Sequence, residues 1–134
     1  LMDSTSMEIS GITALQNNPT LSLKGQGVFI GIIDTGIDYT NSLFRRSDGS
    51  SRIYSIWDQT GNPEEVTSSE GTTQNPYRYD PPEGFYYGVE YKNPLLNQAL
   101  IAENPFSVVP QRDTNGHGTY LASIAAGSSP PLRT

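Results

Sequence analysis

The stretch that decides the fold lies at residues 28–36 and reads VFIGIIDTG. Its first six residues are almost continuously apolar and rich in β-branched side chains, which is typical of a strand buried on both faces of a parallel sheet. Asp34 ends this run, and Thr35-Gly36 follows as a turn. Because ligands of open α/β sheets bind at the carboxyl ends of strands, Asp34 is a candidate functional residue.

A second stretch, residues 115–119, reads NGHGT and begins a helix that we expect over residues 116–126. His117 is the only histidine of the sequence and falls in the first turn, where the partial positive charge of the helix end favours the neutral ring of a general base. A carboxylate at the end of a buried strand needs a partner, and an imidazole N–H supplies one. We therefore expect Asp34 and His117 to pair, the acid fixing the tautomer of the base.

Other segments predict a small number of further elements. The helix over residues 116–126 is expected to pack through Leu121, Ile124 and Ala125. The remaining elements, in chain order, are a helical pattern over residues 9–15, a strand over residues 52–57, a helix between Asn93-Pro94 and Asn104-Pro105, and a short strand over residues 106–109.

Residues 58–84 carry no periodicity, and a loop of this length is usually functional or mobile. An aromatic cluster lies at its far end. We interpret these rings as packing that fastens the segment to the domain surface, with a binding rim as the alternative. The members of the cluster are Tyr77, Tyr79, Phe85, Tyr86, Tyr87 and Tyr91.

Composition bounds the function classes. The 134 residues are enough for one domain or part of one. Apolar content is 34%, and 13 glycines and 10 prolines indicate much loop, so the core is small or lies partly in residues outside this sequence. With 14 acidic against 8 basic residues and a net charge of −6, nucleic acid is not an expected partner.

Two further absences narrow the chemistry. No apolar stretch approaches the roughly 18 residues of a membrane span, and no signal-peptide pattern is visible at the first residues. The sequence has no cysteine, which excludes disulfides, thiolate metal sites and a cysteine nucleophile.

The two stretches together resemble a known family. Residues 27–38, GVFIGIIDTGID, resemble the aspartate segment of subtilisin-like serine proteases (subtilases), and residues 113–122, DTNGHGTYLA, resemble their histidine segment. Their order and context also match, since the aspartate follows a core strand and the histidine opens a helix. Residues 51–60 resemble a bacterial subgroup with an insertion between the two motifs. The resemblance covers about residues 9–128.

The resemblance implies an α/β fold, part of an open, mostly parallel sheet flanked by helices and incomplete in this chain. Residues 1–134 would form the N-terminal portion of one catalytic domain, with a loop-rich insertion at about 58–92. The implied location is extracellular or in the cell envelope.

The implied activity is that of a serine endopeptidase that hydrolyses peptide bonds through an Asp-His-Ser relay. Asp34 would be the orienting acid and His117 the general base. The family's Gly-Thr-Ser-Met-Ala type motif does not occur, so the nucleophilic serine lies outside this sequence. The expected partners are a peptide or protein substrate and the part of the domain that carries the serine. Alone, the chain is expected to be inactive.

No cofactor is predicted. Many subtilases have His-Pro-Asp after the Asp-Thr-Gly turn, and its aspartate helps to bind a structural calcium. Here the corresponding stretch is Asn41-Ser42-Leu43, so the resemblance does not predict that calcium site and leaves calcium elsewhere open.

Two other functions remain as alternatives. The chain would also fit a non-catalytic subtilase-like module that keeps the fold without the chemistry. Asp-Thr-Gly after an apolar run is likewise the signature of aspartic proteases, which would use Asp34 in a homodimer because that chemistry needs two carboxylates sharing a proton. The aspartic-protease hypothesis leaves the NGHGT helix start without a role.

Overall fold

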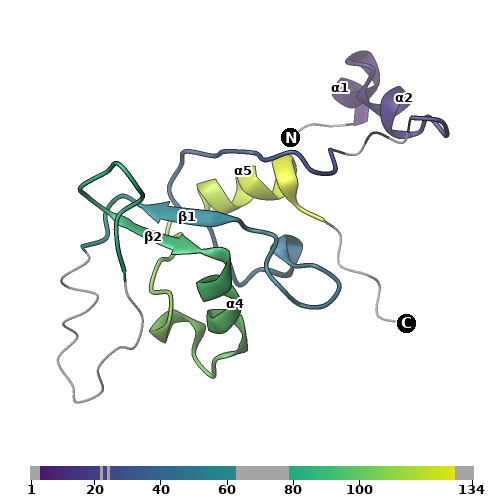
Figure 1. Ribbon diagram of the computed structural model, residues 1–134. Helices are drawn as coiled ribbons and strands as arrows, with labels where there is room; N and C mark the ends of the chain where they lie inside the picture. The colour runs from purple at the N-terminus through teal and green to yellow at the C-terminus, as the bar shows by residue number, and fades with distance from the viewer. Residues whose placement is uncertain (1–3, 22, 24, 63–78, 129–134) are drawn as a thin grey trace. The chain divides into compact units, whose positions relative to one another are not determined.

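The computed structural model describes residues 4–21, 23, 25–62 and 79–128. The chain divides into two compact units, Leu1–Ile32 and Ile33–Thr134. The first unit holds two short helices, and the second holds the other helices and strands of the described residues (Figure 1). Asp34 and His117 therefore both belong to the second unit.

The first unit contains α1 (Ser4–Ile9) and α2 (Ile12–Gln16). Gly11 separates them in a left-handed conformation with φ of 76°, which an uninterrupted helix does not allow. The helical pattern predicted over residues 9–15 is thus confirmed in type but broken at this glycine.

The strand predicted at residues 28–33 does not form in the described part of the chain. Its side chains are exposed, Phe29 to 79% and Ile33 to 94%, and a Cβ on Gly31 would meet no atom within 4 Å. An apolar run has strand propensity, but a strand exists only when a neighbour completes its hydrogen-bond ladder. The expected parallel sheet is therefore not present among these residues.

The described sheet is instead antiparallel and has two strands, β1 (Ser55–Asp58) and β2 (Val89–Lys92). Ser55 pairs with Lys92 at one end and Asp58 with Val89 at the other. The predicted strand over residues 52–57 is confirmed in its second half.

Helix α4 (Asn93–Ile101) follows β2 directly and confirms the helix predicted between the two Asn-Pro pairs. Leu96 and Ala99 are buried on its inner face. Next comes η2 (Pro105–Ser107), a 3₁₀ turn that replaces the strand predicted over residues 106–109. The side chain of Asn104 accepts a bond from the Phe106 N–H at 3.2 Å, so the Asn-Pro pair starts a helical turn here.

The core of the second unit forms where the strands meet α4 and the segment after η2. Two tyrosine hydroxyls donate to consecutive backbone carbonyls, Tyr39 to Val109 at 2.9 Å and Tyr79 to Val108 at 2.6 Å. Burial raises the pKa of Tyr39 to about 12. The core residues are Tyr39, Ile56, Tyr79, Val89, Tyr91, Leu96, Ala99, Val108 and Val109.

The predicted aromatic cluster divides between the core and the surface. Tyr79 and Tyr91 are buried with their ring centroids 5.7 Å apart, which agrees with the packing interpretation. Phe85 and Tyr87 both contact Trp57, at 4.5 and 5.0 Å between centroids, and contact each other at 6.3 Å; both remain about half exposed. Tyr77 lies outside the described residues.

Helix α5 (His117–Ala126) confirms the helix predicted over residues 116–126, but its packing face differs from the predicted one. Leu121 and Ile124 are 39% and 41% exposed, whereas Gly118 and Ala122 are buried. Gly118 and Ala122 are four residues apart and share one face of the helix, and their small size allows a close approach on that face. Among the described helices, none has the length and hydropathy needed to cross a bilayer.

Candidate functional site

The Asp-Thr-Gly turn and the start of α5 lie in close contact, and two glycines allow it. Gly36 has φ of 128°, and a Cβ there would come within 3.3 Å of the Asp113 Cα. A Cβ on Gly118 would run into the carbonyl oxygen of Gly36 and would lie 3.2 Å from the Asp34 Cβ. Glycine at both positions therefore permits the backbones of the two predicted motifs to meet.

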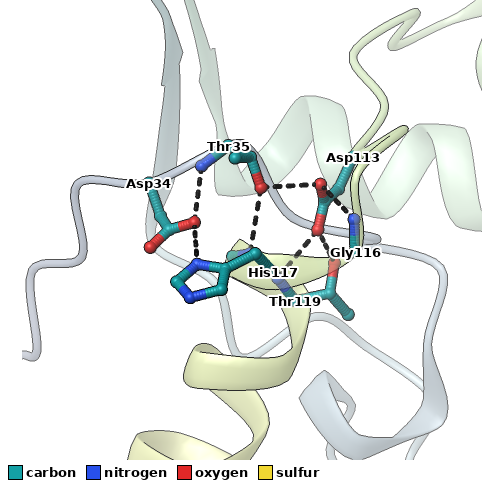
Figure 2. A network of polar contacts seen from close by, with 7 residues as sticks. Asp34, Thr35, Asp113, Gly116, His117 and Thr119 are labelled. Carbon is teal, nitrogen blue, oxygen red and sulfur yellow. Dashed lines mark hydrogen bonds and ion pairs between the residues drawn. The ribbon is translucent and has the colours of Figure 1, made fainter.

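Asp34 and His117 form a direct pair. The Asp34 Oδ1 atom lies 2.7 Å from the His117 Nδ1 atom, as Figure 2 shows. The carboxylate side chain is 13% exposed, while the imidazole is 58% exposed. The bond uses one ring nitrogen and leaves Nε2 on the other side of the ring. The structure thus brings together the two residues that the sequence predicted to meet.

The Asp34 carboxylate is stabilised in its ionised form. The same Oδ1 atom accepts a second bond, from the Thr35 backbone N–H at 2.7 Å. The hydrogen bond with His117, followed by the bond from Thr35, holds the pKa of Asp34 below its usual value. An ionised carboxylate is the form that can accept a hydrogen bond from the Nδ1–H group and balance a positive charge on the imidazole.

A second carboxylate, Asp113, joins the two motifs from the other side, and the sequence did not single it out. Its Oδ1 accepts bonds from the Thr35 hydroxyl and the Gly116 N–H, both at 2.9 Å. Its Oδ2 accepts from the Thr119 N–H at 2.9 Å and the Thr119 hydroxyl at 2.6 Å. Partial burial opposes ionisation of Asp113, but these bonds outweigh it and hold its pKa well below the usual range.

Two threonine hydroxyls complete the network (Figure 2). Thr35 Oγ1 accepts a bond from the Gly118 N–H at 3.0 Å while it donates to Asp113. Thr119 Oγ1 accepts from the Asp38 N–H at 2.8 Å while it also donates to Asp113. The sequence signal that could have identified Asp113 is an acidic residue shortly before a helix start, since such residues accept bonds from the N–H groups of the first turn.

The pair can act as a base towards a hydroxyl brought to Nε2, because the carboxylate keeps the Nδ1 proton in place. Ser128, a serine near the end of α5, donates to the Leu43 carbonyl at 3.2 Å and not to His117.

The stretch at which many subtilases carry a calcium-binding aspartate has a structural role here. Asn41 caps η1 (Ser42–Phe44) by accepting from the Leu43 N–H at 3.0 Å. Within the described residues, no three His, Cys, Asp or Glu side chains gather in a way that could hold a metal ion.

Comparisons with known proteins agree on one family. The Peptidase_S8 profile, described as the Subtilase family, matches residues 25–132, a range that includes Asp34 and His117. In Arabidopsis thaliana, Subtilisin-like protease SBT2.2 is 34% identical over 104 residues, which are 78% of this chain and 11% of the relative. Subtilisin-like protease SBT1.9 of the same plant is 32% identical over 120 residues, 88% of this chain and 14% of the relative.

A solved structure gives the same result. The CspB protease of Clostridium perfringens superposes with a TM-score of 0.67 and 34% sequence identity. The alignment covers 95% of this chain and 21% of that chain. The chain thus spans a small part of the length of the proteins it matches.

Proposed function

Because this chain belongs to the subtilase family, we propose that it supplies the acid and the base of a subtilisin-type serine endopeptidase. Asp34 orients the imidazole, and His117 is the general base. The serine that completes the relay lies outside these residues. The observation that carries the proposal is the 2.7 Å bond between Asp34 Oδ1 and His117 Nδ1, which leaves Nε2 for proton transfer.

The proposed reaction follows from the direction of that bond. His117 Nε2 takes the proton of the serine hydroxyl as the hydroxyl oxygen attacks the peptide carbonyl. The imidazolium so formed then gives the proton to the leaving amine. Asp34 stays ionised throughout and stabilises the positive ring, which its lowered pKa favours.

The scope of the proposal follows the resemblance. The substrates are peptides or proteins, and the required partner is the remainder of the catalytic domain with the serine. Residues 1–134 are then the N-terminal portion of that domain, and an extracellular or cell-envelope location stays a prediction. Calcium binding at a site other than the one after the Asp-Thr-Gly turn also stays to be tested.

Of the alternatives, the aspartic protease has less support. That mechanism needs two carboxylates that share one proton. The carboxylate of Asp34 instead accepts a hydrogen bond from His117, and this bond lowers the pKa of Asp34. The non-catalytic module remains the competing hypothesis, because it would keep the same fold and the same pair.

The test uses the full-length protein that contains this chain, assayed for hydrolysis of a fluorogenic casein between pH 4 and 10. We expect activity at neutral to alkaline pH that a serine-directed sulfonyl fluoride abolishes. His117→Ala should remove it, while Asp48→Asn, which changes an exposed turn, should not. Activity that peaks at acid pH and survives His117→Ala would indicate the aspartic protease. No hydrolysis at any pH would indicate the module.

A further inference from the structure

We propose that Asp113 is a positioning residue, whose carboxylate holds the turn that carries Asp34 against the helix start that carries His117. This inference rests on the proposed function, since it assigns a third residue to the same pair. Asp113 does not contact the imidazole, so its effect on the reaction is exerted through other groups.

The first step is that one carboxylate bonds to both motifs. Oδ1 accepts from the Thr35 hydroxyl on the turn and from the Gly116 N–H at the helix start. Oδ2 accepts from the backbone and the hydroxyl of Thr119 in the first turn of α5. Removing this carboxylate would therefore loosen both sides at once.

The second step concerns the direction of two hydroxyl bonds. A threonine hydroxyl has one proton to donate and lone pairs that accept. Because an ionised Asp113 can only accept, the hydroxyls of Thr35 and Thr119 both donate to it, and their lone pairs are left to face other donors. These donors are the Gly118 N–H for Thr35 and the Asp38 N–H for Thr119. Asp113 thus fixes the orientation of both hydroxyls, and each hydroxyl then accepts a backbone N–H from the other motif.

The third step concerns the helix end. The first N–H groups of a helix have no intrahelical acceptor. In α5, the Thr119 N–H donates to Asp113 and the Gly118 N–H donates to Thr35. These two bonds fix the first turn of the helix to the Asp-Thr-Gly turn. His117 stands at the first position of that turn. A displacement of about 1 Å in such a site is enough to cost roughly 100-fold in rate.

The experiment compares Asp113→Asn with Asp48→Asn in the full-length protein. Asparagine keeps the shape of the side chain but has one acceptor oxygen where aspartate has two. In either orientation of the amide, its NH₂ group faces a backbone N–H that it cannot satisfy, that of Gly116 or that of Thr119. Asp48 is a matched control, because it also accepts from a following N–H and hydroxyl, those of Ser50 at 2.9 and 2.6 Å, in an exposed turn.

For Asp113→Asn we expect kcat to fall about 100-fold with KM changed less than about twofold, per active site titrated with a sulfonyl fluoride. The control should keep both constants. Thr119→Val should reproduce the loss in kcat, and Thr119→Ser, which keeps the hydroxyl, should recover most of it. A rise in KM with kcat unchanged would overturn the proposal, and so would equal constants for the two Asn variants.

Residue-level hydrogen exchange gives a readout that does not depend on catalysis. The Gly118 and Thr119 amides should lose protection in Asp113→Asn and keep it in Asp48→Asn. Unchanged protection would overturn the proposal. If the wild type hydrolyses no peptide, the proposed function fails, and the exchange result alone then decides whether Asp113 holds the two motifs together.

Discussion

Gly36 and Gly118 meet backbone to backbone, so that a methyl group on Gly118 would clash with the Gly36 carbonyl oxygen. This contact brings Asp34, two residues before Gly36, to the ring of His117, one residue before Gly118. The Asp–His distance is thus controlled by two positions that have no side chain.

The first prediction concerns Gly118→Ala. Alanine in a helix is favoured over glycine by about 1 kcal/mol, but forcing a methyl group into a packed contact costs about 1–3 kcal/mol. We expect a lower melting temperature and a kcat/KM reduced by at least tenfold, measured by calorimetry and peptide hydrolysis in the full-length protein. Ser123→Ala on the same helix serves as the control. A Gly118→Ala variant as active as that control would contradict the close contact.

The second prediction concerns the acid of the pair. Asp34→Asn should lower kcat/KM by roughly four orders of magnitude, because an amide no longer fixes the Nδ1–H tautomer or balances the imidazolium. The measurement is a pH–rate profile of hydrolysis. A profile that keeps its shape and height would show that Asp34 has no part in the reaction.

The third prediction concerns acid stability. The pKa values of Asp34 and Asp113 are lowered in the folded state, so the unfolded chain binds more protons in the window below the ordinary value of 3.8. Their contribution to the free energy of unfolding is present above that value and is lost as pH falls through the folded pKa values. In urea denaturation from pH 6 to 2, wild type and Asp113→Asn should converge. A difference that stays constant with pH would refute this.

The fourth prediction concerns the core that supports the site. Tyr39→Phe removes the donor to the Val109 carbonyl and leaves that buried acceptor without its bond. We expect a loss of about 1–2 kcal/mol in the free energy of unfolding, measured by chemical denaturation. Tyr86→Phe is the matched control, because Tyr86 is 98% exposed and should change stability by less than about 0.5 kcal/mol. Equal effects would exclude the buried bond as the cause.

The features that the sequence predicted correctly have local causes. The start of α5 follows from glycines around a polar residue, and α4 follows from an Asn-Pro start and apolar spacing. The pairing of Asp34 with His117 followed from chemistry, because each residue needed a partner of the kind the other supplies.

The features that were missed depend on distant residues. Residues 28–33 have strand propensity, yet they form no strand in the described ranges. Asp113 bonds to a threonine 78 positions away, which no spacing rule indicates. The exposure of Leu121 and Ile124 shows the same limit, since the buried face of the helix includes Gly118, which contacts the distant Gly36.

The antiparallel pairing of β1 with β2 has a consequence for how such chains diverge. Asp58 lies opposite Val89, so the chain between them departs and returns at neighbouring points of the ladder. Closing a longer loop costs only about 0.6 kcal/mol for each doubling of its length. The segment between these two residues can therefore gain or lose residues over evolution without changing the distance between Asp34 and His117. Variation in length there would allow related chains to differ in surface around the same Asp34–His117 pair.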